Sequence, residues 1–299
     1  MRERQRRVGD AVTGGERRTG LLGRRIAYSL SPALHTQEAR ENGLHVSYAL
    51  IDEAPGASDD VIVRAAITRC ADEGYVGINV TQPFKELAMA YADHVDESAA
   101  AIGAVNTLRF GADGISGHNT DIEGFGAELD VGIGDTDLRR VIQFGAGGAG
   151  AATAYAALQR GALAVLILDP QIERATSLAS RLGSVFPGRA LSAGDPQAVA
   201  TVMDTATGVI NASTQGTAAN PGSPIDAGLL HEGLWVADVL YSPRESTLLR
   251  DARLAGARTT NGGLMLVNQA ALSFEIFHGL SPDVGRMWAH FVELMEDQR

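Results

Sequence analysis

The chain of 299 residues has only one cysteine, Cys70, and no long apolar run. A single cysteine excludes an internal disulfide and a cysteine-rich metal site. We therefore expect Cys70 to be structural and the protein to work in a reducing cytoplasm. A membrane-spanning helix needs about 18 or more consecutive apolar residues, and no such stretch is present. The sequence thus predicts a globular protein with no membrane span.

Basic side chains are also scarce. Lysine and arginine number 25 against 36 aspartates and glutamates, which gives a formal net charge of -11. Such a chain repels the phosphate backbone of nucleic acids, so we expect a small-molecule substrate rather than a nucleic-acid partner. The composition does not decide the oligomeric state, and a homodimer is left open.

The first 18 residues lack the apolar stretch that a secretory signal would need. They carry six arginines without hydrophobic periodicity. We expect residues 1–18 to form a flexible extension that takes no part in the chemistry.

Short apolar runs alternate with helical patterns along most of the chain. We expect strands over residues 21–28, 46–51, 75–80, 104–109, 141–144, 164–168, 208–211 and 234–239. Helical patterns cover residues 32–42, 58–72, 148–160, 172–182, 264–278 and 282–296. Strands that alternate with helices predict right-handed crossovers and a parallel sheet. The fold class is therefore α/β, with two domains.

We place the domain boundary near Asp121. Residues 19–121 would form an N-terminal α/β substrate domain, and residues 122–261 a Rossmann-type, doubly wound dinucleotide-binding domain. A second crossing near Asn261 would return residues 262–299 to the first domain.

A glycine-rich segment directly follows the strand at 141–144 and opens the helix at 148–160. Its first glycine permits a tight turn, its second lets the backbone approach a pyrophosphate, and its last permits close helix–strand packing. The helix N-terminus offers unpaired N–H groups to the phosphates. The alternative is a purely structural turn. We expect the cofactor to contact Gly145, Ala146, Gly147, Gly148, Ala149 and Gly150.

Asp169 ends the strand that follows this helix. An acidic residue at this place accepts hydrogen bonds from the adenosine ribose and repels a 2′-phosphate. No arginine follows it immediately, and Arg174 lies a turn further on. These residues favour NAD over NADP as the cofactor. The alternative role for Asp169 is a cap of the helix that starts near Ile172.

Three groups of polar motifs lie outside the nucleotide domain pattern. They are residues 29–35 (SLSPALH), residues 79–85 (NVTQPFK), and residues 103–107 (GAVNT) with 117–121 (GHNTD). With residues 211–216 (NASTQG), 238–243 (DVLYSP) and 265–271 (MLVNQAA), this order resembles the shikimate and quinate dehydrogenase family. The resemblance covers about residues 20–296.

The resemblance implies roles at individual positions. On the substrate side, it implies that hydroxyls hold the carboxylate and that polar side chains hold the ring hydroxyls: Ser29 and Ser31 for the carboxylate, and Thr81, Asn106 and Gln269, with Tyr241 beside them, for the ring. It also implies that Val239 and Gly262 lie near the nicotinamide and that Lys85 and Asp121 form the catalytic pair.

The chemistry of Lys85 and Asp121 is consistent with that assignment. Oxidation of a secondary alcohol needs a group that removes the hydroxyl proton as hydride leaves, and the reverse reaction needs its return. A lysine can do both, or can stabilise developing oxyanion charge. Taken alone, Lys85 could be a solvated lysine, and Asp121 and Ser31 could be helix caps.

The sequence departs from the family at two places. It has Asp169-Pro170-Gln171 where NADP-using members carry Asn-Arg-Thr, and Asn261-Gly262-Gly263-Leu264 where Asp-Gly-Leu-Gly is usual. The hypothesis is an oxidoreductase of the shikimate pathway that interconverts shikimate and 3-dehydroshikimate by hydride transfer with NAD, without a metal. Quinate, another cyclic polyol or an aminoshikimate-type substrate stay open, as does a non-catalytic nucleotide-binding regulator.

Overall fold

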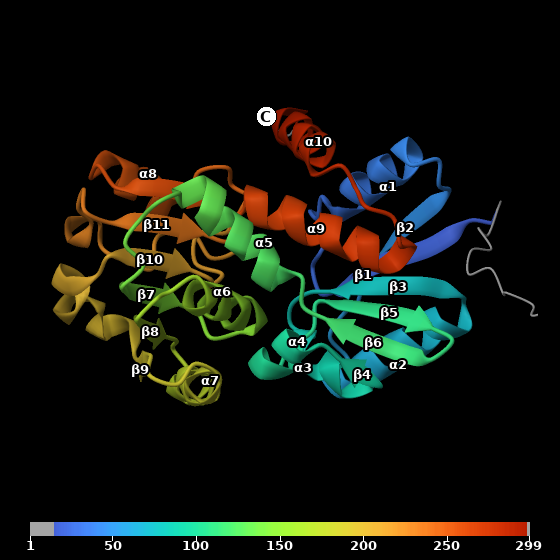
Figure 1. Cartoon of the computed structure of the whole chain (residues 1–299), viewed down its shortest axis with the longest axis horizontal. Helices are drawn as coiled ribbons and strands as arrows, with labels where there is room; N and C mark the ends of the chain where they lie inside the picture. Colours follow the sequence, from blue (N-terminus) through green and yellow to red (C-terminus); the bar gives the residue numbers. More distant parts are fainter. Residues whose placement is uncertain (1–14, 298–299) are drawn as a thin grey trace, which may run out of the picture.

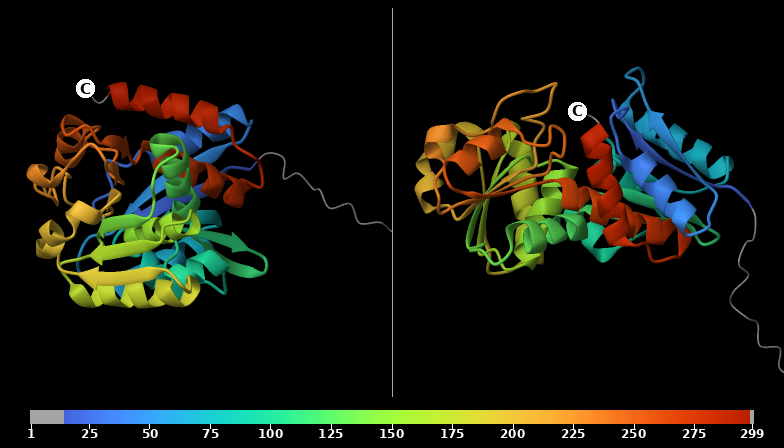
Figure 2. Two further views of the ribbon diagram at one scale, coloured as in Figure 1. Left: turned by 60° about the vertical axis from the view of Figure 1, so that its left-hand side comes forward. Right: turned by 90° about the horizontal axis from the view of Figure 1, so that it is seen from above.

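The computed structural model describes residues 15–297, which form two α/β domains joined by a pair of helices (Figure 1). Each domain has a six-stranded sheet. The connecting helices are α5 (Asp121–Ala127) and α9 (Gly263–His278), and α10 (Val284–Asp297) packs on α9. The view from above in Figure 2 shows α9 and α10 between the two sheets.

The first sheet is mixed. Its strands are β1 (Arg17–Gly23), β2 (Val46–Asp52), β3 (Tyr75–Val80), β4 (His94–Val95), β5 (Thr107–Gly111) and β6 (Gly114–His118), in the order β2-β1-β3-β5-β6-β4. Strand β5 runs antiparallel to both neighbours, so the expected all-parallel arrangement is wrong for this sheet. The helices of this domain are α1 (Ser31–Glu41), α2 (Asp59–Asp72), α3 (Lys85–Ala88) and α4 (Glu97–Ile102).

The two faces of this sheet are covered by segments from opposite ends of the chain. On one face α2 buries Val63, Ala66 and Ile67 in a core with strand residues. On the other face lies α9, and a side chain at Gly77 of β3 would come within 2.4 Å of the Phe277 ring. The C-terminal helix α9 therefore packs on the sheet of the first domain.

The second sheet is entirely parallel. Its strands are β7 (Arg140–Phe144), β8 (Ala164–Leu168), β9 (Ala190–Gly194), β10 (Gly208–Asn211), β11 (Trp235–Asp238) and β12 (Arg258–Asn261), in the order β12-β11-β10-β7-β8-β9. Helices α6 (Gly148–Gln159), α7 (Ile172–Val185) and α8 (Thr247–Leu254) flank it. All four residues of β10 and of β11 are buried, as in strands covered on both faces.

The order of the second sheet reverses between β7 and β10. In open parallel sheets, ligands bind outside the carboxyl ends of the strands at such a reversal. The glycine-rich segment leaves β7 at this point. The Rossmann-type architecture predicted from the sequence is therefore confirmed.

Several expected boundaries differ from the structure. The strand expected over residues 21–28 ends at Gly23, because the chain turns at Arg25, which has a φ of 57°. The backbone N–H groups of Arg25 and Ile26 donate to the Asp52 carboxylate at 2.6 and 3.1 Å, which stabilises the turn. The strand expected at 104–109 begins only at Thr107.

The expected N-terminal extension is too long by at least two residues. Arg17 and Arg18 belong to β1 and pair in register with Val46 and Ser47 of β2. Residues 1–14, which make up most of that extension, lie outside the described residues.

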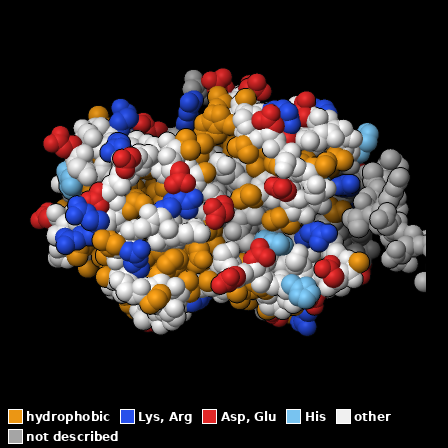
Figure 3. Space-filling model, viewed as in Figure 1, with side chains coloured by type: hydrophobic (Ala, Val, Ile, Leu, Met, Phe, Trp, Pro, Cys, Tyr) orange, Lys and Arg blue, Asp and Glu red, His pale blue; other side chains and the backbone are white. Residues whose placement is uncertain are grey.

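The molecular face in Figure 3 carries acidic and basic side chains interspersed with apolar ones. No broad basic patch is visible on this face. Within residues 15–297, no helix is long and apolar enough to cross a membrane.

Candidate active site

Two adjoining cavities lie between the domains. One has a volume of about 190 Å³ and the other of about 730 Å³. Pockets for drug-sized ligands measure about 300–1,000 Å³, so the smaller cavity fits a small ring and the larger one fits a nucleotide. Thr81, Lys85 and Ala149 line both cavities. A small ring in one cavity and a nucleotide in the other would therefore meet at these three residues.

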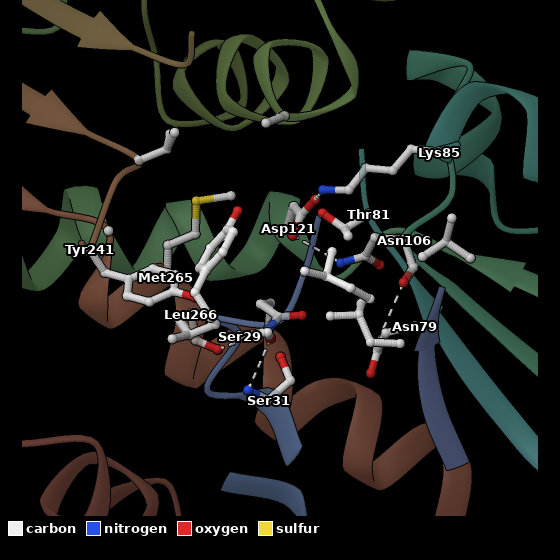
Figure 4. Close-up of a pocket in the computed structure, with 18 residues that line it drawn as sticks. Ser29, Ser31, Asn79, Thr81, Lys85, Asn106, Asp121, Tyr241, Met265 and Leu266 are labelled. Atoms are coloured by element: carbon white, nitrogen blue, oxygen red, sulfur yellow. Dashed lines mark hydrogen bonds and ion pairs between the residues drawn. The ribbon is translucent and has the colours of Figure 1, made fainter. Parts of the chain in front are cut away.

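The Lys85 ammonium and the Asp121 carboxylate form an ion pair where the cavities join (Figure 4). The Nζ to Oδ2 distance is 2.5 Å, and the side chains are only 14% and 7% exposed. Asn106 donates to the other Asp121 oxygen at 2.9 Å. Asp121 is the first residue of α5 and makes no cap, since Thr120 occupies the N-cap position. Both side chains thus face the cavity instead of solvent.

The predicted substrate-side residues converge on the smaller cavity. All six of them line it: Ser29, Ser31, Thr81, Asn106, Tyr241 and Gln269. The alternative cap role for Ser31 is not seen, because Leu30 is the N-cap of α1 and makes no side-chain cap bond. Instead, the backbone N–H of Ser31 donates to the Ser29 hydroxyl at 3.3 Å.

Asn79 also lines this cavity, although the sequence analysis assigned it no role. Its side-chain oxygen accepts from the Tyr48 hydroxyl at 2.8 Å, and its amide donates to Thr107 at 3.0 Å. Burial raises the pKa of Tyr48, so this phenol stays a donor. Asn79 is the first residue of the NVTQPFK motif, and that position was the available signal.

Two tyrosines lie on opposite domains at the same cavity. Tyr241 follows β11 in the nucleotide domain, and burial raises its pKa to about 12. Tyr28 lies in the turn before α1 and is 59% exposed, so it stands at the cavity mouth. Tyr28 directly precedes the motif at residues 29–35 and was not predicted as a site residue.

The glycine-rich segment has the geometry of a phosphate cradle. Gly145 has a φ of 99°, and a side chain there would come within 2.6 Å of the Ala212 carbonyl oxygen. A side chain at Gly150 would come within 2.2 Å of the Gly145 carbonyl oxygen. Helix α6 has Gly147 as its N-cap and no side-chain cap bond, so its first N–H groups are available to an anion. These residues fit the pyrophosphate of a dinucleotide.

A buried glutamine braces this cradle. Gln143 donates to the carbonyl oxygens of Gly145 and Gly150 at 3.0 and 2.8 Å. Thr153 of α6 in turn donates to the Gln143 side-chain oxygen at 2.8 Å. The loop is therefore held in position by strand β7 and helix α6 together. Gln143 was not predicted from the sequence, because it lies in a strand and outside the glycine-rich segment.

Asp169 lines the larger cavity and touches the cradle. Its carboxylate accepts from the backbone N–H of Ala146 at 2.8 Å and from that of Gln171 at 2.9 Å. The second bond holds Gln171, which is itself the N-cap of α7, so the alternative role of Asp169 as the cap of this helix is not seen. Both carboxylate oxygens thus already hold backbone groups.

A cation also lies at this cavity. Arg174 of α7 pairs with Glu86 of α3 at 3.2 Å, across the gap between the domains. Its guanidinium would be 3.3 Å from a side chain at Gly147. The pair therefore lies close to the cradle, and Glu86 supplies a negative charge next to Arg174.

Val239 and Gly262 face each other where the second sheet meets α9. Both line the smaller cavity. A side chain at Gly262 would come within 2.0 Å of the Val239 carbonyl oxygen, and the Gly262 N–H donates to Leu240 at 3.1 Å. This close approach requires glycine, even though the flanking residues depart from the usual family run.

His35 and His118, which lie within the motifs at residues 29–35 and 117–121, line neither cavity. His35 is fully buried beside Tyr48, and burial lowers its pKa to about 3. His118 lies between Asp96 and Ser116 at 2.5 and 3.0 Å. In the part of the chain that the structure describes, no three His, Cys, Asp or Glu side chains gather as a metal site.

Known proteins resemble the chain on both sides of the site. A family model described as the shikimate dehydrogenase substrate binding domain matches residues 21–108. A second, described as the shikimate 5'-dehydrogenase C-terminal domain, matches residues 264–290. Shikimate dehydrogenase (NADP(+)) of Streptomyces avermitilis is 44% identical over 279 residues, which cover 92% of this chain and 94% of that protein.

Two further relatives carry quinate in their names. Quinate/shikimate dehydrogenase (NAD(+)) of Corynebacterium efficiens is 38% identical over 276 residues, covering 92% of this chain and 97% of that protein. A solved structure of quinate dehydrogenase from Corynebacterium glutamicum in complex with NAD has a TM-score of 0.84 and 35% identity, covering 93% and 100% of the two chains. The names of similar proteins thus include both NAD and NADP.

Proposed function

The chain belongs to the shikimate dehydrogenase family, and from this membership we propose that it interconverts shikimate and 3-dehydroshikimate with NAD as its cofactor. One observation carries the proposal. Lys85 lines both the small and the large cavity and is paired with Asp121 at 2.5 Å. A proton-transferring group thus stands where a ring hydroxyl and a nicotinamide would meet.

Different residues of the small cavity would bind different parts of the substrate. The hydroxyls of Ser29 and Ser31 can donate hydrogen bonds to a carboxylate without a charge partner. Asn106 and Gln269 present amides to ring hydroxyls, and Thr81 adds a third polar group. This arrangement suits a small ring that carries an acid at one end and hydroxyls at the other.

Lys85 as a neutral amine accepts the proton of the ring hydroxyl, and the carbon–oxygen bond becomes a carbonyl. The glycine-rich cradle and the larger cavity would hold the nicotinamide cofactor, which when bound would supply the acceptor for the hydride that leaves the same carbon. The Asp121 carboxylate lies against the lysine nitrogen and stabilises the ammonium that forms. Asn106 fixes the orientation of Asp121. In the reverse direction the Lys85 ammonium returns its proton to the forming alkoxide.

The preference for NAD is supported by charge at the adenosine end. Asp169 presents a carboxylate to the large cavity, and Glu86 neutralises the nearby Arg174. A 2′-phosphate would be repelled by the Asp169 carboxylate, and Arg174 would not be free to bind it, because it is paired with Glu86. Quinate is the second candidate substrate, since similar proteins carry its name.

The test is an initial-rate grid in which NAD and NADP are each paired with shikimate and quinate. We expect the highest kcat/KM for shikimate with NAD. A preference for NADP would contradict the role given to Asp169. Turnover of quinate but not of shikimate would show that quinate is the substrate. Absence of turnover in all four pairs would overturn the proposed function.

A further inference from the structure

The first turn of α9 forms part of the candidate active site, and its N-cap residue supplies no side-chain acceptor, although Asn261 before it accepts from the Gly263 N–H at 3.0 Å. Gly262, Met265 and Leu266 at this turn line the small cavity, and so does Gln269 in the next turn. The N-cap position is Gly262, which has no side chain to accept from the free N–H groups of the helix. A capping Ser or Asp cannot stand there, because the Val239 carbonyl oxygen would lie 2.0 Å from its Cβ atom.

A carboxylate from a distant segment supplies the missing acceptor. Glu128 opens the π-helical turn η2 (Glu128–Ile133), which continues α5. Its Oε2 accepts from the Met265 N–H at 3.0 Å. Its Oε1 accepts from the Thr260 hydroxyl of β12. The side chain is 0% exposed, and water cannot replace these bonds.

Glu128 therefore touches every segment where the chain passes between the domains. It lies on the segment that leaves the first domain, and it binds the last strand of the second domain and the helix that returns. Close packing fixes the arrangement, since a side chain at Gly132 would come within 2.8 Å of Glu128 Oε1. A side chain at Gly124 of α5 would come within 2.7 Å of the Met265 carbonyl oxygen.

We propose that Glu128 is a positioning residue of the dehydrogenase, whose carboxylate caps α9 and thereby sets Met265 and Gln269 against the cofactor and the substrate ring. The inference rests on the proposed function, because it assigns Glu128 a part in the same site. Negative charge at a helix N-terminus is stabilising, and the Met265 N–H, which has no partner within the helix, gains an acceptor. Glu128 touches neither ligand cavity itself.

Burial raises the pKa of Glu128 to about 7, so its charge changes near neutral pH. Other charged or titratable side chains of the elements packed against it are engaged elsewhere or lie at the far end of their helix. They are Asp121 with Lys85, Glu123 and Asp130 with Arg160, Arg258 with the carbonyls of Ile133 and Asp135, Asp238 with Ser246, and Glu275 and His278 in the last turns of α9. The capping strength of Glu128 therefore follows its own ionisation.

The main test is the full-length variant Glu128→Gln. Glutamine keeps the length and one acceptor oxygen, but its NH₂ group cannot accept from Thr260 or Met265. We expect kcat to fall about 10- to 100-fold, as for an active-site misplacement of about 1 Å, with the Kd for NAD unchanged within about threefold. A step in kcat near pH 7 in the wild type should be absent from the variant. Asp130→Asn, an exposed change on the same turn, is the matched control and should match the wild type.

A second readout does not depend on activity. Amide hydrogen exchange of Leu264–Leu266 should be at least about tenfold faster in Glu128→Gln than in the wild type, and unchanged in Asp130→Asn. Wild-type values of kcat, pH profile and exchange in Glu128→Gln would overturn the inference. If the wild type turned over no substrate, the proposed function would fail, and hydrogen exchange would then test the capping role by itself. Faster exchange in Glu128→Gln than in the wild type would support the capping role, and equal exchange would contradict it.

Thr260→Val keeps the test decisive if Glu128→Gln does not fold. The Thr260 hydroxyl lowers the pKa of Glu128, so its removal should move the step in kcat to higher pH. An unchanged midpoint would overturn the inference.

Discussion

The pH dependence of stability offers a sharp test of the buried carboxylate at the domain junction. Burial raises the pKa of Glu128 from its ordinary value of 4.5 to about 7 in the folded protein. Between these values the folded state holds a proton that the unfolded state has released. The contribution of Glu128 to stability is thus fully present below pH 4.5 and is lost as pH rises through about 7. At about 1.4 kcal/mol for each pH unit, the loss amounts to about 3 kcal/mol.

Glu128→Gln removes this titration. We expect the free energy of unfolding of the variant, relative to the wild type, to rise by about 3 kcal/mol between pH 4.5 and 8. Urea unfolding at half-unit pH steps measures it, because the other titrating groups contribute equally to both proteins. Asp130→Asn serves as the control with an exposed carboxylate. Parallel curves for the wild type and Glu128→Gln would refute the reasoning.

Three further substitutions test the site. Lys85→Ala should lower kcat by about 10²–10⁴-fold while NAD still binds, which fluorescence titration and initial rates would separate; unchanged turnover contradicts the proton-transfer role. Gly150→Ala should weaken NAD binding at least about tenfold, since the new methyl group would lie 2.2 Å from the Gly145 carbonyl oxygen; calorimetry that shows equal affinity argues against the cradle. Tyr48→Phe should cost about 1–2 kcal/mol of stability and raise the KM for shikimate, because Asn79 loses a donor; wild-type Tm and KM would contradict this.

The site residues that could be predicted from the sequence are those that lie in short, contiguous motifs. The glycine-rich turn, the NVTQPFK segment with Lys85 and the GHNTD segment with Asp121 each combine unusual residues over a few positions. Strand β7 and helix α6 around the turn also follow from local apolar patterns. These local motifs can be recognised without knowing which distant segments they contact in the folded protein.

The residues that sequence reasoning missed act through contacts between distant segments. Gln143 looks like an ordinary strand residue until Gly150 folds back over it. Glu128 meets Met265 only when α5 and α9 cross. The short strands β4 and β12 follow from pairing with β6 and β11 and carry little pattern of their own. The antiparallel β5 likewise depends on its neighbours, because a single strand does not encode its direction.

The return of α9 to the first sheet has a consequence for synthesis of the chain. All strands of the first domain have been made once His118 is complete, yet Phe277, which packs over Gly77 of β3, follows only after the entire second domain. The second domain is continuous in sequence and relies on near-neighbour βα units, so it is expected to fold while the first sheet still exposes one apolar face. That face is the surface on which a growing chain would be most exposed to aggregation, and the last two helices end that exposure.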